Sequence, residues 1–130
     1  MKVFILKKRK DFLKAAKGYK VVTNGLVLQA ALSFCLGKKD CCFVGYTTSK
    51  KIGKATVRNF VRRRLRAVVQ KIMPENALPG VDYVLVGRHN TADLNFEYLC
   101  NKIKSAVIEI NRQILEKEKN YVKKFDDIVN

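Results

Sequence analysis

The chain of 130 residues has few acidic side chains, one histidine and no long apolar run. Its longest apolar stretches, such as Cys41–Val44 and Tyr83–Val86, fall far short of the ~20 residues that a membrane span requires. Residues 1–6 are too short for a signal peptide, and their basic neighbours follow the apolar stretch instead of preceding it. We therefore expect a cytoplasmic protein with no membrane partner.

The scarcity of carboxylates and histidine argues against a protein active site or a metal centre. The 11 Asp and Glu residues are scattered, whereas a metal nuclease needs carboxylates that converge on its ions. Cys41 and Cys42 are adjacent, so on a strand they would point to opposite faces and could not share a zinc ion. With His89 as the single histidine, we expect no catalytic and no metal-binding residue, and reduced cysteines that pack as small hydrophobic residues.

What the chain does have is an excess of positive charge together with enough apolar residues for a core. Its 27 Lys and Arg residues against 11 Asp and Glu residues give a net charge of +16, and 48% of its residues are hydrophobic. The charge indicates a polyanionic partner, and the apolar fraction excludes a disordered basic tail. Because no repeat or linker divides the chain, we interpret residues 1–130 as a single domain, with a frayed tail at about 116–130.

The predicted elements follow the order helix, three strands, helix, strand, helix. They are a helix at about 11–17, strands at 19–23, about 26–34 and 42–48, a helix at about 55–72, a strand at 81–87 and a helix at about 96–116. Asp11 is a candidate cap of the first helix, Asn24-Gly25 predicts a tight hairpin, Pro74 ends the second helix and Asn95 caps the last one. This order predicts an α+β fold, a single-domain two-layer sandwich with a four-stranded sheet whose other face is at least partly open.

Each of the two long helices carries one apolar face that we expect to pack on the sheet. The predicted core positions are Val57, Val61, Leu65, Val68 and Ile72 in the second helix, and Phe96, Leu99, Ile103, Val107, Ile110 and Ile114 in the third.

Residues 50–66, which include most of the second helix, contain eight Lys or Arg residues and no carboxylate. On an ordinary solvated helix, acidic residues four positions away would pair with the basic ones. Arg58, Arg62 and Arg66 are spaced by four and therefore form one stripe beside the apolar face. Because arginine can bind phosphate oxygens through two parallel hydrogen bonds, this crossover helix is predicted to hold a phosphate backbone.

The stretch Ser49–Arg66 resembles the signature of the bacterial ribonuclease P protein subunit. That signature has a Lys-Lys pair, in many members a Gly two residues later, then an Arg-Asn-Arg triplet and further basic residues. The opening Leu6–Phe12 is also similar to the family, and the strands at 26–30, 43–48 and 82–86 follow in family order, so the resemblance covers about residues 5–115. Two positions depart from the pattern, since Phe60 replaces the last arginine of the triplet and Ala67 replaces a polar residue.

The resemblance implies an endonuclease of tRNA processing whose RNA subunit performs the hydrolysis. In that family the RNA removes the 5′ leader of precursor tRNA with Mg²⁺ ions that are bound mainly by the RNA. The protein is the non-catalytic subunit of the ribonucleoprotein: it binds the ribonuclease P RNA and the 5′ leader, and strengthens productive metal binding. No protein oligomer is required.

The resemblance also implies two RNA-binding surfaces on this single domain. The surface for the catalytic RNA would comprise Lys50, Lys51, Lys54, Arg58, Asn59, Arg62, Arg63 and Arg66. The first helix and the open face of the sheet would form a cleft for the single-stranded leader, with Phe12 and Gln29 as its candidate residues. A second aromatic residue, which many members carry one helical turn after the first, is Ala16 here. That Phe12 is an ordinary core residue of a short helix stays an alternative.

Two other classes of protein stay open at this point. A basic ribosomal or other structural RNA-binding protein, without any catalytic association, would have a similar composition, and the spacing within residues 50–66 is what argues against it. A free-standing nuclease is the other class, which the scattered carboxylates disfavour.

Overall fold

The strands and helices lie close to where the sequence places them, and they include one strand more than expected. The structure, a computed structural model, describes residues 1–33 and 40–118. Its elements are β1 (Lys2–Ile5), α1 (Arg9–Ala16), β2 (Tyr19–Thr23), β3 (Leu26–Leu32), β4 (Cys41–Thr47), a 3₁₀ turn η1 (Lys50–Ile52), α2 (Ala55–Asn76), β5 (Val81–Gly87) and α3 (Phe96–Lys117). The α+β class and the order of the predicted elements are confirmed. The expected strand end at Phe34 and the tail from residue 119 lie outside the described residues.

The sheet has five strands in the order β1-β4-β5-β3-β2. β2 and β3 form the expected antiparallel hairpin, in which Gly25 takes a φ of 100° that favours glycine. β3 pairs antiparallel with β5, whereas β4 and β5 are parallel, so that α2 is the crossover between them.

The prediction of a four-stranded sheet is wrong because β1 adds a parallel edge strand beside β4. Lys2 lies opposite Cys41, and the pairing continues to Ile5 opposite Val44. A segment of four residues without alternating apolar and polar side chains is hard to identify as a strand from its sequence. Its pairing depends on a partner far along the chain, which periodicity in a short window does not detect.

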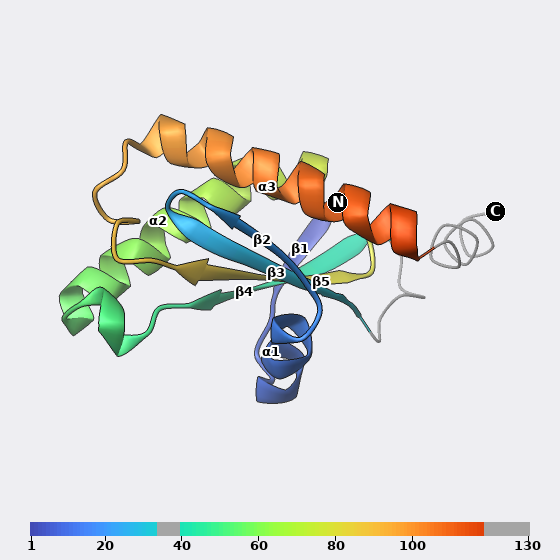
Figure 1. Cartoon of the computed structure of the whole chain (residues 1–130), viewed down its shortest axis with the longest axis horizontal. Coiled ribbons are helices and arrows are strands. Elements are labelled where there is room, and N and C mark those ends of the chain that lie inside the picture. Colours follow the sequence, from blue (N-terminus) through green and yellow to red (C-terminus); the bar gives the residue numbers. More distant parts are fainter. Residues whose placement is uncertain (34–39, 119–130) are drawn as a thin grey trace.

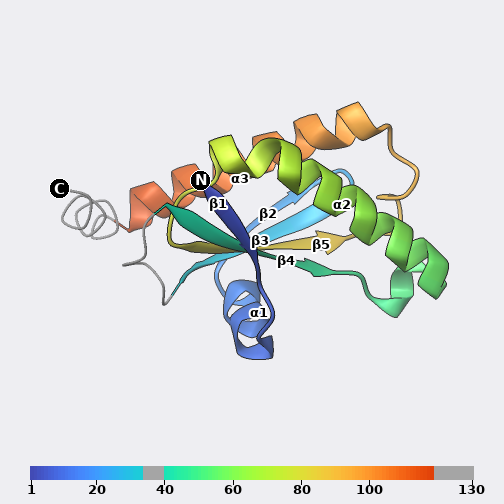
Figure 2. The same ribbon diagram turned by 180° about the vertical axis from the view of Figure 1, so that it is seen from behind.

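α2 and α3 cover one face of the sheet, and α1 lies against the other face (Figures 1 and 2). The predicted apolar faces of α2 and α3 are buried in this core except at their first positions, where Val57 is 36% and Phe96 is 37% exposed. A smaller cluster beneath α1 contains Leu6, Ala15 and Val84. The face opposite α2 and α3, called the open face from here on, is therefore covered only in part.

The ends of the helices differ from the sequence-based expectation at two points. α1 begins at Arg9, so Asp11 is not its cap but lies in its first turn, where a negative charge is favourable. α2 does not end at Pro74 but continues to Asn76, whose side-chain amide donates a hydrogen bond to the Ile72 carbonyl (2.6 Å). The cap of α3 is as predicted, because the backbone N–H of Tyr98 donates to Asn95 Oδ1 (3.1 Å).

A buried polar network joins the end of α2 to β5 and α3. The hydroxyl of Tyr83 donates to Asn111 Oδ1 (2.5 Å) and accepts from the backbone N–H of Leu78 (2.8 Å). Asn111 in turn donates to the carbonyl of Asn76 (2.7 Å). Since buried polar groups are costly when unpaired, this network holds the C-terminal end of α2 in one position.

In residues 1–33 and 40–118, no helix combines the length and the hydropathy needed to cross a membrane.

Candidate nucleic-acid interface

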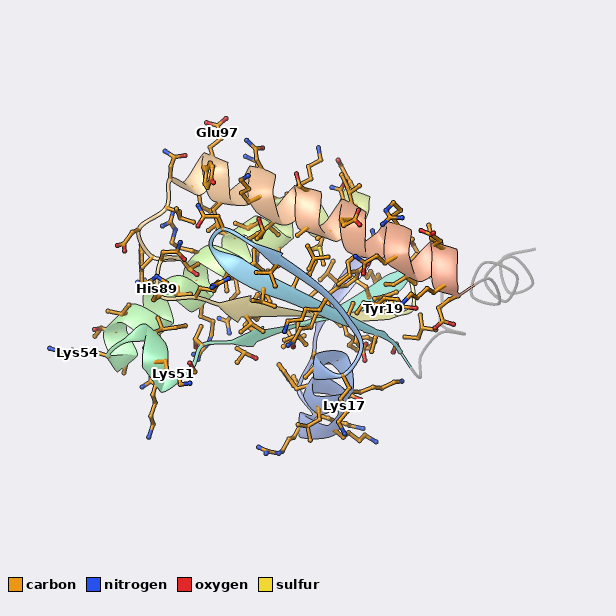
Figure 3. The ribbon with its side chains drawn as sticks, in the orientation of Figure 1. Lys17, Tyr19, Lys51, Lys54, His89 and Glu97 are labelled. Carbon is orange, nitrogen blue, oxygen red and sulfur yellow. The ribbon has the colours of Figure 1, made fainter. Side chains whose placement is uncertain are left out.

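The basic segment begins where β4 leaves the sheet. β4 runs into the single turn of η1, and Gly53 follows with a φ of 149°, a region that favours glycine, before α2 begins. Lys50, Lys51 and Lys54 are all exposed. Figure 3 shows Lys51 and Lys54 extending away from the body of the molecule at this end. The turn therefore presents three ammonium groups ahead of the helix.

Arg58, Arg62 and Arg66 follow along one flank of α2 and are called the arginine ridge from here on. Arg62 Nη2 donates to Thr48 Oγ1 at 2.8 Å, and its Nη1 donates to Asn59 Oδ1 at 3.4 Å. The guanidinium of Arg66 lies over the ring of Tyr46, 5.8 Å from its centroid. Arg58 is half-buried, and its Nε has no hydrogen-bond partner. Tyr46 and Thr48, at the end of β4, thus hold two guanidinium groups of the ridge in place, while several of their N–H groups stay available.

No carboxylate of the described chain lies within 4.0 Å of the arginine ridge. The side-chain ion pairs that the structure does contain lie on α3, where Arg112 pairs with Glu109 (2.7 Å) and Glu116 (2.5 Å). Arg112 is therefore an internally neutralised arginine, whereas the ridge keeps its positive charge for a partner.

The residues beside the ridge are exposed. Asn59 and Arg63 are both exposed, and Phe60 between them is 41% exposed. The guanidinium groups of Arg63 and Arg64 lie 5.9 and 5.5 Å from the Phe60 ring centroid. The aromatic ring at position 60 therefore contacts arginines where the family signature has an arginine itself.

Arg64 differs from the other arginines of α2, and the sequence does not reveal this. Its Nη1 donates to the carbonyls of Ala92 (2.8 Å) and Thr91 (3.3 Å), and its Nη2 donates to the carbonyl of Leu94 (2.5 Å). The fork of the guanidinium is thus used to fix the connection between β5 and α3. That connection is also tied to the β2–β3 turn, where Thr91 Oγ1 donates to the carbonyl of Gly25.

Phe12 projects from α1 onto the open face and is half-buried. Its ring packs so closely on β4 that a Cβ atom at Gly45 would lie 2.5 Å from Phe12 Cζ. Phe12 also packs against the small cluster of Leu6, Ala15 and Val84. The residue therefore has a packing role, and part of its ring stays accessible.

Gln29 lies on β3, half-buried on the same open face as Phe12. Its neighbours across the sheet are Lys20 on β2 and Val84 on β5. Since β5 lies between β3 and β4, Gln29 and the ring of Phe12 share a face but belong to different parts of it. Both stay predicted sites of leader binding.

A pocket of about 400 Å³ lies on the open face beside the start of α1. It is lined by Lys7, Lys8 and Lys10 on one side and by Asp82 of β5 among others. Asp82 is only 3% exposed, and its Oδ1 has no hydrogen-bond partner. Burial raises the pKa of its carboxyl, an effect that a hydrogen bond from Ser33 opposes.

The raised pKa of Asp82 predicts a pH-dependent stability. Asp82 stabilises the fold fully only below its unfolded-state pKa of about 3.9, and this contribution is lost as the pH rises through the folded-state pKa. The side chain of Asp82→Asn cannot ionise. The difference in free energy of unfolding, variant minus wild type, should therefore increase from about pH 4 upward, by at most about 1.4 kcal/mol per pH unit. Urea denaturation of both proteins from about pH 4 to about pH 7 measures this difference. A difference that does not change with pH would contradict the assignment.

The described residues contain no group of three His, Cys, Asp or Glu side chains that could hold a metal ion. Cys41, Cys42 and Cys100 are buried free thiols, and burial raises the pKa of Cys42 to about 12. Cys35 lies outside the described residues.

Comparisons with known proteins agree with this architecture. The family model described as Ribonuclease P matches residues 2–111. The ribonuclease P protein component of Gluconacetobacter diazotrophicus is 46% identical over 102 residues, which cover 76% of this chain and 84% of the relative. The corresponding protein of Ruegeria pomeroyi is 36% identical over 110 residues, covering 84% of this chain and 87% of the relative.

Solved structures share the fold at lower identity. The RNase P protein from Thermotoga maritima aligns with a TM-score of 0.68 at 23% identity, covering 81% of this chain and 96% of that one. The RNase P protein of Staphylococcus aureus aligns with a TM-score of 0.66, also at 23% identity, covering 80% of this chain and 92% of that one. The match of the family model to most of the chain, together with the two relatives, shows that this chain belongs to the ribonuclease P protein family.

Proposed function

We propose that this chain binds the ribonuclease P RNA through the arginine ridge and its basic surroundings, and the 5′ leader of precursor tRNA through the open face. Its family makes it the protein component of ribonuclease P, an enzyme of tRNA processing. The observation that carries the proposal is the arginine ridge, three arginines at a spacing of four with no carboxylate of residues 1–33 and 40–118 in reach. An array of this kind fits regularly spaced phosphates.

The surface proposed for the catalytic RNA extends from η1 along α2. It comprises Lys50, Lys51, Lys54, Arg58, Asn59, Arg62, Arg63 and Arg66, which are exposed or half-buried. Their charge neutralises RNA phosphates and releases counterions, so binding should weaken steeply as salt increases. A structural RNA-binding protein of the ribosome would bind RNA phosphates through the same electrostatic attraction, but the relatives with which the chain aligns are ribonuclease P protein components.

The leader is proposed to lie on the open face beside α1. Single strands bind to surfaces that combine positive charge with groups on which bases stack. Phe12 offers the accessible part of its ring, Gln29 offers a side-chain amide, and the pocket near the start of α1 adds Lys7, Lys8 and Lys10.

Hydrolysis is proposed to be carried by the RNA subunit, with Mg²⁺ bound mainly by that RNA. Bound there, Mg²⁺ would act as a Lewis acid that activates the attacking water and stabilises charge on the leaving oxygen. The residues of this chain contribute positive charge that lowers the repulsion between RNA strands, and this lets the RNA bind its ions at lower Mg²⁺ concentration. Neither a membrane nor a protein oligomer is needed for this role, which we place in the cytoplasm.

The test is reconstitution with the RNA subunit of the same organism. The purified protein alone should not cleave precursor tRNA, and it should restore 5′ leader removal to the RNA at Mg²⁺ concentrations too low for the RNA alone. The assembled enzyme should also bind precursor tRNA more tightly than mature tRNA, because only the precursor carries the leader. Gel analysis of the cleaved leader and binding titrations measure the two effects.

Each part of the proposal can fail separately. Cleavage by the protein in Mg²⁺ without RNA would contradict the non-catalytic role. Equal affinity of the assembled enzyme for precursor and mature tRNA would contradict leader binding on the open face while leaving binding of the catalytic RNA intact.

A further inference from the structure

A second pocket lies on the other side of the sheet, between the edge strand β1, β4 and α2. It has a volume of about 320 Å³, at the lower end of the ~300–1,000 Å³ range of small-ligand clefts. Val3, Val44 and Val69 give it apolar walls, Tyr46 contributes an aromatic ring, and Arg66 and Gln70 are its polar residues. Figure 2 shows β1 and α2, the two elements at its border, on the near side of the molecule.

The arginine ridge leads into this pocket. Positions 58, 62, 66 and 70 of α2 are spaced by four, so Gln70 continues the line of Arg58, Arg62 and Arg66 by one more turn. The last arginine of the ridge is therefore also a wall of the pocket. Gln70, the next position on this line, has a side-chain amide instead of a charged guanidinium, and an amide can both donate and accept a hydrogen bond.

Tyr46 and Arg66 form a cation–π pair at the border of ridge and pocket. Arg66 is an exposed residue, and its guanidinium carbon lies 5.8 Å from the ring centroid of Tyr46. Burial raises the pKa of Tyr46 to about 12, so its hydroxyl is neutral under physiological conditions. A guanidinium plane supported from behind by an aromatic ring is a platform on which unpaired RNA bases stack.

We propose that this pocket takes one unpaired nucleobase of the RNA whose backbone lies on the arginine ridge. The base stacks on the Arg66–Tyr46 pair, and its polar edge bonds to the amide of Gln70. This inference rests on the proposed function, because it places the base next to phosphates that the ridge holds.

The charge around the pocket favours RNA over other occupants. Among the described residues that line the pocket, Arg66 has the one charged side chain, and there is neither Asp nor Glu. Pairing of a second copy of this chain along the outer edge of β1 is disfavoured, because each copy carries a net charge of +16 and the two would repel each other. RNA brings the opposite charge together with planar bases.

The first test is the binding of the ribonuclease P RNA to the variants Tyr46→Leu and Gln70→Ala over a range of salt concentrations. Tyr46→Leu keeps an apolar side chain but removes the stacking support, and it should weaken binding about 5- to 150-fold. Gln70→Ala, at an exposed position that does not threaten the fold, should weaken binding about 2- to 13-fold. Neither variant removes a charge, so the salt dependence should keep its slope.

Tyr98→Leu is the matched control. Tyr98 also lies beneath a cation, since Lys102 Nζ is 5.3 Å from its ring centroid, but it belongs to α3 and bonds to Asn24 in the β2–β3 turn. Its replacement should leave RNA affinity unchanged.

The second test locates the base. A photo-crosslinking amino acid in place of Gln70 should attach to one unpaired nucleotide of the RNA. Removing the base of that nucleotide should weaken binding by the wild type but have little further effect on Tyr46→Leu, because the two changes remove the same contact.

The outcomes separate this inference from the function on which it rests. If removal of ridge arginines weakens binding but Tyr46→Leu and Gln70→Ala do not, the base pocket is refuted and the ridge stands. Should the ridge variants also bind like the wild type, both proposals fail. A protein dimer in light scattering that Tyr46→Leu dissociates would make a second copy the occupant and overturn the inference.

Discussion

Replacing Arg58 and Arg62 together with alanine is expected to weaken binding of the ribonuclease P RNA about 10²- to 10⁴-fold, since each arginine contributes roughly the energy of a charged hydrogen bond. Each lost phosphate contact should also lower the magnitude of the log–log salt slope by about 0.7–0.9, or about 1.4–1.8 for the pair. The physical reason is that both arginines lie on the ridge and have no carboxylate partner among the described residues. Filter-binding titrations at several salt concentrations give both quantities.

The matched control for the ridge is Arg112→Ala on α3. Arg112 is the same residue type on a helix of the same length, but Glu109 and Glu116 already neutralise it. Its replacement should change neither the affinity nor the salt slope. If Arg112→Ala weakens binding as much as the double replacement, the effect comes from net charge alone, and the ridge has no special role.

Arg64→Ala is expected to act on stability instead of on RNA binding. The side chain donates to the carbonyls of Thr91, Ala92 and Leu94, and it lies over the rings of Phe60 and Phe96. Losing even one such charged hydrogen bond costs about 1.5–3 kcal/mol, so the free energy of unfolding should fall by that amount or more. Urea denaturation monitored by circular dichroism measures the loss as a lower midpoint at an unchanged slope.

Arg64→Lys is the informative companion to Arg64→Ala. Lysine keeps the charge but cannot reach three carbonyls with a planar fork. The free energy of unfolding of Arg64→Lys should therefore fall by most of the amount lost in Arg64→Ala, while the salt slope of RNA binding stays that of the wild type. A lysine variant as stable as the wild type would show that the charge alone, without the fork, holds the β5–α3 connection.

Arg62 and Arg64 are two residues apart in one basic run, and only the fold shows that their roles differ. In the sequence, residues 62–64 are three consecutive arginines. Helical spacing placed Arg62 on the stripe, but nothing local indicated that Arg64 would meet three backbone carbonyls nearly thirty residues later. Those carbonyls belong to the connection between β5 and α3, whose path depends on the packing of both elements.

The same distinction applies to the candidate interface as a whole. The stripe on α2 follows from residue spacing, and continuing that spacing to Gln70 would have indicated where it ends. Tyr46 could not be added in this way, because it comes from β4 and meets Arg66 only when α2 packs across the sheet. For Phe12, the sequence predicted a binding role but did not reveal the contact with Gly45, which gives the residue a packing role as well.

The local pattern of the chain determined the hairpin at Asn24-Gly25, the buried faces of α2 and α3, the cap at Asn95 and the arginine ridge. These features depend on turn chemistry and on periodicities of a few residues, which a short window of sequence contains. The tertiary structure alone decided that Lys2–Ile5 joins the sheet as a parallel edge, that Asp82 is buried, and that Arg64 serves the fold. Each of these outcomes depends on partners far away in the chain, and such contacts exist only after the layers have packed together.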